Sequence, residues 1–500
     1  MSRSRIIVVT IGVMLSLFMA AVESTVIATA MPTIITQLGG LAIYSWAFSA
    51  YMLASTTTVP IYGKLSDLYG RRPVYLAAMA LFLAGSVLSG QAQSMSELVA
   101  FSALQGLGAG GLHPLAFIMI GDMFSFEQRA RMQGFFSGVW GVASVVGPLL
   151  GGFLVDHVSW RWVFYVNLAP GLIAALLVWT GWRDAGREAG APRVSVDYIG
   201  AALLSAGVVA LLLGLFQLGT PASWGLLVLA LAFFAALLCV ERRAADPILP
   251  LPLFNGRLFA VACTHGLLAG WTMFGSTAFV PLFVQAALGT SATAAGSTLT
   301  PMMLSWVCAS IVGSRLLLRF GYRTIALVGM CSLTTGAFSM SQVGAQTPLP
   351  IIMLCAGLMG VGMGFSVPSF MIAVQSSVER RALGTATAML QFSRSIGGTL
   401  GVSVMGAVLS MYLAASGVSQ VVVGRNRAAD AGVMLDSALQ TALVGGIRSV
   451  FLLAAAAAAL GLVAVALAPR GRIMGQAGRA SDPGPSVAAV SQPTNPQPRR

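Results

Sequence analysis

The sequence predicts an all-α membrane protein that crosses the bilayer many times. Hydrophobic residues make up 57% of its 500 residues and charged residues only 9%, far below the roughly one quarter that is typical of soluble domains. Apolar runs of about 18 or more residues recur along the whole chain, and each is long enough to cross the hydrocarbon core. Most charged residues lie in short loops between these runs, as the positive-inside rule requires.

Fourteen apolar segments are predicted to form membrane-spanning helices in a 6+2+6 arrangement. Six make up an N-terminal half (1–182), two an insert with flanking loops (183–256) and six a C-terminal half (257–470). Residues 471–500 are expected to form a disordered cytoplasmic tail because they are rich in Pro, Ser and Ala. The segments lie at roughly 6–30, 44–63, 73–92, 97–120, 131–155, 162–182, 197–216, 224–241, 257–285, 294–314, 323–342, 349–373, 382–412 and 446–468.

The basic residues predict the orientation of the chain. Of the 28 Lys and Arg residues, 23 lie on the side of the N-terminus, four lie on the other side and one, Arg394, lies within a segment. This asymmetry places both termini in the cytoplasm. All basic residues except Lys64 are Arg, which hints at a GC-rich bacterial genome and so at a bacterial plasma or inner membrane. The net charge of +13 does not indicate nucleic acid as a partner, since no basic surface interleaved with aromatic residues is present in the sequence.

The sequence has no pattern typical of a metal site or of an enzyme. Its five cysteines all fall inside apolar runs without paired or metal-type spacing, so we expect free thiols that pack as small hydrophobes. A membrane-embedded enzyme that used Glu23 and His113 would need a nucleophile and base pair or a cluster of metal ligands. Neither is present in the sequence, so we expect a protein that is not an enzyme and binds no metal.

A charged stretch, Gly63–Pro73, separates the second and third segments. Its glycines allow close approach of backbones or a turn, and Pro73 suits the first turn of a helix. Asp67 can accept hydrogen bonds from the amides at a helix end or pair with an arginine such as Arg131, which follows the fourth segment. Such contacts would form a cytoplasmic gate, and the alternative is a basic loop that only sets the topology. The residues predicted for the gate are Gly63, Asp67, Gly70, Arg71, Arg72 and Arg131.

Two short internal similarities predict that the halves are built alike. Leu318–Thr324 resembles Asp67–Pro73 at an offset of 251 residues, and Phe392–Gly397 resembles Phe136–Gly141 at an offset of 256. Repeated halves of this kind are common in secondary transporters. The second hinge has no counterpart of Asp67, so a gate is expected in the first half only.

Glu23 lies within the first apolar segment, where an ionisable residue is costly. A carboxylate at the centre of a membrane helix costs about 2.5–3.5 kcal/mol on the insertion scale for Asp, so such residues are usually paired or functional. Burial favours the protonated form of a carboxylic acid, which makes proton exchange at Glu23 an expected function. Competition between that proton and a lipophilic cation would be antiport in its simplest form. The alternative is a side chain that extends to the outer surface of the membrane.

Arg394 and His113 are the other residues predicted to act in proton coupling or substrate binding. Arg394 is expected to pair with Glu23 or with an acidic group of the substrate across the two halves, or else to bond carbonyls beside Gly397. His113 has the neutral-range titration that suits a proton relay, although a helical histidine next to a proline often bonds only a free carbonyl. His265, in the ninth segment, is a further candidate.

Glycines at close spacing are expected to pack the helices against one another. Gly106–Gly111 formally matches G-x-G-x-x-G, but a dinucleotide site needs a preceding strand and a βαβ unit, and this motif lies inside a membrane helix. Gly134 and Gly138 have small-xxx-small spacing. The 24 methionines are expected to serve packing, and they would also suit adaptable binding of varied apolar substrates.

Five motifs in chain order resemble those of one transporter family. They are Glu23–Pro32, Gly63–Pro73, Gly147–Gly152, Trp160–Asn167 and Gln391–Gly398. Together they resemble the fourteen-helix drug:proton antiporter branch (the EmrB/QacA type) of the major facilitator superfamily, over about residues 5–470. Glu23 stands where this branch usually has Asp. The residues that match the helix 5 antiporter motif are Gly147, Pro148, Gly151 and Gly152.

The resemblance implies a secondary active exporter of small amphipathic or lipophilic compounds, as in multidrug efflux and antibiotic resistance. It implies proton antiport with alternating access around a central cavity, and no cofactor besides the proton gradient. The expected partners are lipophilic small molecules, protons and the lipid bilayer, with an accessory periplasmic protein if the cell is Gram-negative.

One position departs from the pattern of the family. Three residues before Gln105 the family has an Arg to which it assigns a part in proton coupling, and here that position is Ser102. This difference leaves open a lipid or metabolite exporter of the same fold with weak or altered proton coupling. It also leaves open uptake by symport, against which the helix 5 motif argues by resemblance.

Overall fold

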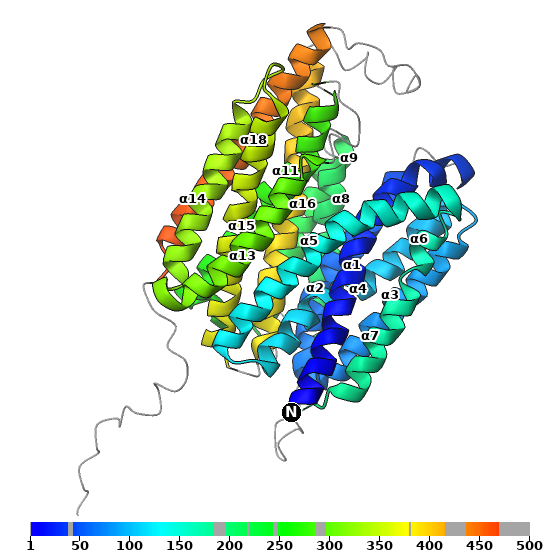
Figure 1. Ribbon diagram of the computed structural model, residues 1–500, viewed down its shortest axis with the longest axis vertical. Coiled ribbons are helices and arrows are strands. Elements are labelled where there is room, and N and C mark those ends of the chain that lie inside the picture. The colour runs from blue at the N-terminus through cyan, green and yellow to red at the C-terminus, as the bar shows by residue number, and fades with distance from the viewer. Residues whose placement is uncertain are drawn as a thin grey trace, which may run out of the picture.

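The protein is a bundle of long α-helices (Figure 1). The computed structural model describes residues 2–38, 44–184, 197–217, 220–243, 249, 251–286, 288, 297–379, 382–415 and 437–469. Within these ranges, 11 helices are long and apolar enough to cross a membrane. The prediction of an all-helical, multi-pass membrane protein is confirmed, while the count of fourteen spans and the cytoplasmic side of the termini stay predictions.

Each predicted segment of the first half coincides with a helix or a pair of helices. Ser94 begins the fourth helix by accepting a hydrogen bond from the Glu97 backbone N–H (3.2 Å), and Ser125 and Gln128 form a capping box at the start of the fifth. The helices are α1 (Arg3–Leu38), α2 (Tyr44–Tyr69), α3 (Arg71–Gln91), α4 (Met95–Met123), α5 (Phe126–His157), α6 (Trp162–Tyr165) and α7 (Leu168–Gly181).

The insert and the second half are likewise helical where they are described. The last helix begins at Ser437, earlier than the predicted start near residue 446, and most of the predicted connection at 413–445 lies outside the described residues. The helices are α8 (Tyr198–Phe216), α9 (Pro221–Glu241), α10 (Leu251–Phe254), α11 (Arg257–Ala286), α13 (Thr300–Phe320), α14 (Tyr322–Ser341), α15 (Leu349–Ser377), α16 (Leu383–Ala415) and α18 (Ser437–Ala466).

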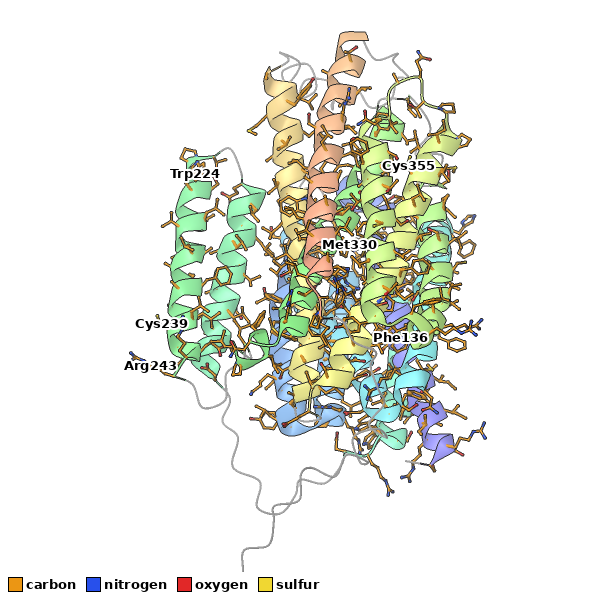
Figure 2. All side chains as sticks on the ribbon, turned by 90° about the vertical axis from the view of Figure 1, so that its left-hand side faces the viewer. Phe136, Trp224, Cys239, Arg243, Met330 and Cys355 are labelled. Atoms are coloured by element: carbon orange, nitrogen blue, oxygen red, sulfur yellow. The ribbon has the colours of Figure 1, made fainter. Side chains whose placement is uncertain are left out.

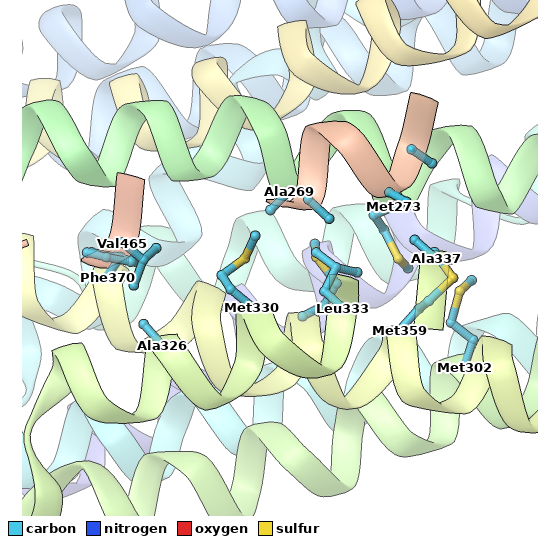
Figure 3. Close-up of a cluster of buried hydrophobic side chains, with 14 of the residues drawn as sticks. Ala269, Met273, Met302, Ala326, Met330, Leu333, Ala337, Met359, Phe370 and Val465 are labelled. Carbon is cyan, nitrogen blue, oxygen red and sulfur yellow. The ribbon is translucent and has the colours of Figure 1, made fainter. Parts of the chain in front are cut away.

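Separate hydrophobic cores form within residues 9–182 and within residues 259–468. In the second of these cores, methionines from several helices meet, among them Met302, Met330 and Met359, which are fully buried (Figure 3). These methionines therefore serve packing, as expected. The predicted domain boundaries after residues 182 and 256 stay predictions.

The halves are joined mainly by two helix pairs, since α5 packs against α13 and α2 packs against α16, and α4 also packs against α16. The insert lies beside the second pair: α8 packs against both α2 and α16, and α9 packs on α8 at the margin of the bundle (Figure 2). Large apolar side chains on α9, such as Trp224 and Leu231, are about 70% exposed. Such a surface fits a helix whose outer side faces lipid tails.

The two hinge glycines have the same backbone conformation. Gly70, between α2 and α3, has a φ of 94°, and Gly321, between α13 and α14, has a φ of 78°. Only glycine adopts these values without strain. The two positions are 251 residues apart, so the similarity of the hinges in sequence corresponds to a similarity in structure.

The prediction that glycines allow close helix packing is confirmed in α4, and it is wrong at Gly138 in α5. A Cβ at Gly108 would lie 2.5 Å from the Ala78 carbonyl oxygen of α3, and one at Gly110 would lie 3.1 Å from the Ser55 carbonyl carbon of α2. A Cβ at Gly138 would meet no atom within 4 Å among the described residues. The spacing of small residues in α5 therefore does not mark a close contact at this position.

This difference predicts opposite effects of the same substitution. Gly108→Ala is expected to lower the free energy of unfolding by about 1–3 kcal/mol, because the added methyl group must push α3 and α4 apart. Gly138→Ala is the matched control and is expected to be neutral or slightly stabilising, since alanine favours helix. The midpoints of thermal unfolding of the purified proteins in detergent would show this. Equal midpoints for the two variants would contradict the described packing.

Candidate functional site

The hinge between α2 and α3 holds a buried network of charges. The Arg71 side chain donates from Nη1 to Asp67 Oδ1 (2.6 Å) and from Nε to Asp122 Oδ2 (2.9 Å) at the end of α4. The Arg71 backbone N–H donates to Asp184 Oδ1 (2.7 Å), which caps the start of α3. The turn at Gly70 brings these groups together. One arginine therefore ties the ends of α2, α3 and α4.

Asp67 also binds the second half of the chain. Its Oδ1 accepts from the Gly384 N–H (3.1 Å), and its Oδ2 accepts from the N–H (2.7 Å) and the hydroxyl (2.8 Å) of Thr385. Both residues lie in the first turn of α16, where amides lack partners within the helix and negative charge is favoured. The expected contact with helix-end amides thus exists. The ion-pair partner of Asp67 is Arg71, four residues later and beyond the turn at Gly70, and the expected Arg131 side chain lies outside the described residues.

Arg129 and Gln375 add contacts between the halves at the same end of the bundle. Arg129, near the start of α5, donates from Nη1 to the Gln375 carbonyl oxygen (3.2 Å) near the end of α15. Gln375 donates from Nε2 to the Phe117 carbonyl oxygen of α4 (3.3 Å). Together with Asp67, these side chains join the halves at the end that the basic residues predict to be cytoplasmic.

The other residues predicted for the gate have separate contacts. A Cβ at Gly63 would lie 3.0 Å from the Gly384 carbonyl oxygen, so glycine allows α2 to approach α16 closely. The Arg72 guanidinium lies 6.0 Å from the centre of the Trp179 ring on α7. Arg72 therefore interacts within the first half.

Glu23 lies inside the first half and is surrounded by the uncharged polar side chains of Ser86, Gln105 and Asn167. We call these four residues the Glu23 cluster. Glu23 is 1% exposed, so the alternative of a side chain at the outer surface is wrong. Gln105 donates from Nε2 to Glu23 Oε1 (2.8 Å), and Asn167 donates from Nδ2 to Glu23 Oε2. The same two amides donate to Ser86 Oγ, at 3.1 and 3.0 Å, and Ser86 donates to the Phe164 carbonyl oxygen (2.9 Å).

The Glu23 cluster can accommodate either protonation state of its carboxyl group. Two amide donors stabilise the carboxylate, and no cation among the described residues holds it in the charged form. Gln105 Oε1 is buried and has no hydrogen-bond partner within the described structure. It can accept a hydrogen bond from the protonated acid if the amide rotates. The arrangement is therefore chemically suited to take up and release one proton.

Arg394 lies in the middle of α16, and its predicted pairing with Glu23 is wrong. No ion pair joins the two among the described residues. The Glu23 carboxylate is enclosed by side chains of the first half, while Arg394 donates from Nη2 to the Gln391 side chain (2.8 Å), one turn earlier in its own helix. This bond goes to a side chain and not to the backbone carbonyls beside Gly397. The acidic group of a substrate remains as the predicted partner.

Both candidate histidines lie on helices that pack against α16, the helix of Arg394. His113, in α4, has its ring 5.5 Å from the Trp140 ring of α5 and also interacts with the Ala109 backbone, one turn earlier. His265, in α11, is 2% exposed, and its neighbour Gly266 lies against the Arg394 backbone, because a Cβ at Gly266 would lie 3.6 Å from the Arg394 backbone nitrogen. The structure thus brings Arg394 together with a histidine from each half.

The fold and these motifs agree with a comparison of the sequence with known families. Residues 13–402 match the Major Facilitator Superfamily, which is well over half of the chain. The chain belongs to the major facilitator superfamily. The resemblance read from the motifs is therefore confirmed, and the protein is a transporter and not an enzyme.

Members of this superfamily with similar sequences are named as multidrug transporters. The chain is 40% identical over 405 residues to the multidrug transporter protein MdtP of Bacillus subtilis (strain 168), which covers 80% of this chain and 74% of MdtP. It is 37% identical over 406 residues to multidrug resistance protein 3 of the same strain, with coverages of 80% and 79%. The crystal structure of the human organic anion transporter MFSD10 has a TM-score of 0.65 at 15% identity and covers 93% of this chain and 100% of that one. At this identity the likeness shows the fold alone.

The departure from the family pattern at Ser102 lies next to the Glu23 cluster. Ser102 is buried in α4 and precedes Gln105 by three residues, so both face the same side of the helix. An arginine at this position would place a cation close to Glu23. The serine leaves the cluster uncharged apart from Glu23 itself.

The helix 5 motif of the superfamily lies within α5, which continues to His157. Gly147 and Gly151 are buried. A Cβ at Gly152 would meet no atom within 4 Å among the described residues, and the Pro148 side chain lies outside them. The role of this motif therefore stays a prediction, because no close contact at Gly152 supports it within the described residues.

Sequence reasoning did not assign Ser86, Gln105 and Asn167 to the site. Gln105 and Asn167 stand in motifs that were read only as family markers. A signal was nevertheless available, because an uncharged amide inside an apolar segment is costly unless it is hydrogen-bonded. Each such amide is therefore a candidate partner for the nearest buried acid.

Proposed function

We propose that this protein is a secondary active exporter that exchanges small amphipathic or lipophilic compounds for protons by alternating access. The observation that carries the proposal is the Glu23 cluster: a buried carboxyl group held by neutral donors, without a cationic partner among the described residues. Such a group gains or loses a proton at little structural cost. The proton gradient is the energy source, and no further cofactor is needed.

The contacts between the halves support alternating access. Asp67 and Gln375 bind across the halves at the predicted cytoplasmic end. A transporter that rocks its halves about a central site must break these contacts to open to the cytoplasm and reform them to open outward. The hinge network therefore acts as a gate that favours the state closed to the cytoplasm.

The two relatives named as multidrug transporters support the class of substrate. In this proposal the expected partners are lipophilic small molecules, protons and the lipid bilayer. An accessory periplasmic protein would extend the route in a Gram-negative cell, and the plasma or inner membrane is the site of action.

The test uses inverted membrane vesicles with an established proton gradient, followed by a pH-sensitive dye. Cationic, neutral and acidic fluorescent compounds are added to vesicles with and without the protein. We expect at least one compound to dissipate the gradient only when the protein is present. A gradient that responds to none of them, in vesicles that still take up the compounds, would contradict proton antiport.

The alternative, favoured by Ser102, is a lipid or metabolite exporter of the same fold with weak or altered coupling. The buried serine removes the cation that the family pattern places beside the acid. In the vesicle assay this alternative predicts that no compound dissipates the gradient. A Ser102→Arg variant that gains a gradient response would then assign the loss to this position.

A further inference from the structure

Arg394 is a cation without a counter-ion in the described part of the chain. Its one hydrogen-bond partner there is the neutral Gln391 side chain. The Arg394 side chain is partly exposed within the bundle, so its remaining N–H donors are open to a ligand. A guanidinium held at the middle of a membrane helix is costly unless an anion compensates it.

The Arg394 backbone is held in place by close packing of α11 against α16. A Cβ at Gly270 would lie 3.0 Å from the Arg394 carbonyl carbon and 3.2 Å from its Cα. A Cβ at Gly397, three residues later, would lie 2.7 Å from Leu267 Cα. Glycine at both positions lets the backbones touch, so the guanidinium starts from a fixed point. Pre-positioned donors of this kind reduce the entropy cost of binding.

A second, independent observation is an unsatisfied donor or acceptor beside the arginine. His265 Nε2 is buried and has no hydrogen-bond partner within the described residues, and the side chain is 2% exposed. The His265 ring lies 4.8 Å from the Phe370 ring, and a Cβ at the neighbouring Gly266 would lie 3.6 Å from the Arg394 backbone nitrogen. His113 lies beside Trp140 on α4, a helix of the first half that packs against α16. An arginine, two imidazoles and two aromatic rings thus lie where α4 and α11 pack against α16, and no carboxylate pairs with the arginine in the described structure.

We propose that Arg394, with His113 and His265, binds the negatively charged group of the transported compound, so that the substrates are amphipathic organic anions. A carboxylate or sulfonate can form two parallel bonds with a guanidinium, which is a strong and directional contact. The Trp140 and Phe370 rings would lie against the apolar part of the compound. A lipophilic cation would instead meet like charge at this place. The inference rests on the proposed export function and names its class of substrate.

The test measures binding to the purified protein in phosphatidylcholine nanodiscs, without a proton gradient. The probes are two dansyl compounds of equal length, one ending in a carboxylate and one in a trimethylammonium group. The wild-type protein is expected to bind the carboxylate probe at least about tenfold more tightly, and Arg394→Gln to weaken that binding by about 10- to 100-fold. Arg394→Lys should restore part of the loss. Arg448→Gln is the control, because Arg448 is exposed on α18 and donates only to the Gln342 side chain in the described structure.

The outcomes separate this inference from the proposed function. A wild-type preference for the ammonium probe, or no binding of the carboxylate probe, would overturn the inference even if Arg394→Gln did not fold. Unchanged affinity of folded Arg394→Gln for the carboxylate probe would also overturn it. Because no gradient is present, failure of proton coupling in vesicles leaves these results unaffected. If short-chain phosphatidylglycerol, but not phosphatidylcholine, displaces the carboxylate probe, the bound anion is a lipid headgroup. If neither lipid displaces the probe, the bound anion is a small organic acid.

Discussion

Replacing Glu23 with Gln is expected to reduce proton-coupled export to the level of vesicles that lack the protein. The amide has nearly the same shape as the carboxyl group. Its oxygen can accept a hydrogen bond from Gln105 or Asn167, and its NH2 group can donate to the oxygen of the other once that amide rotates. It cannot take up or release a proton. The cluster would then be fixed in a state that resembles the protonated acid, so the transporter would lose the step that links the proton gradient to movement of substrate.

Two measurements separate this effect from damage to the fold. Exchange of labelled for unlabelled compound across the membrane needs no net proton movement, so it should persist in Glu23→Gln while uptake driven by the gradient is lost. Glu97→Gln is the matched control, because Glu97 is an exposed acid in the first turn of α4, and it should transport at the wild-type rate. Gradient-driven uptake that survives Glu23→Gln would show that another group carries the proton.

The sequence predicted which residues carry charge into the bundle better than it predicted their partners. Glu23 was expected to be functional because an acid in an apolar segment is costly, and that argument needs only the local sequence. Its hydrogen-bond donors are 82 and 144 residues away along the chain. Contacts at such separations depend on how the helices pack, and hydrophobic periodicity does not determine that packing.

The partners of Asp67 were likewise harder to predict than its role. The expectation that Asp67 accepts bonds from helix-end amides followed from its chemistry and is confirmed, but the helix in question begins more than 300 residues later. The expected partner Arg131 was chosen for its place in a nearby loop, whereas the turn at Gly70 presents Arg71 instead. The prediction of close packing at Gly138 was wrong for a related reason. The small-xxx-small spacing places a small residue on one face of a helix but does not show that another helix lies against that face.

The second large effect is expected from Asp67→Asn, which should open the predicted cytoplasmic end. The carboxylate binds both Arg71 and the first turn of α16, and the side chains of this ion pair are only 6% and 9% exposed. Removing one partner of a buried pair typically costs about 3–5 kcal/mol. The Arg71 contact lies within the first half and is lost in both states, whereas the contacts with Gly384 and Thr385 exist only when the halves meet at this end. Only the loss of these hydrogen bonds to the charged group, about 1.5–3 kcal/mol, falls on the closed state alone.

A loss of about 1.5–3 kcal/mol in the closed state alone would move the equilibrium between closed and open states by about 10- to 100-fold. Spin labels at Tyr69 and Phe320, which are exposed at the ends of α2 and α13, would report the separation of the halves by double electron–electron resonance in a background without native cysteines. Asp184→Asn is the matched control, since Asp184 caps α3 within the first half and its described contacts do not reach the second. If Asp67→Asn gave the wild-type distances, or if both variants widened them equally, the contact with α16 would be a structural cap and not a gate. A longer distance in Asp67→Asn alone would show that the hinge between α2 and α3 controls access from the cytoplasm through one carboxylate.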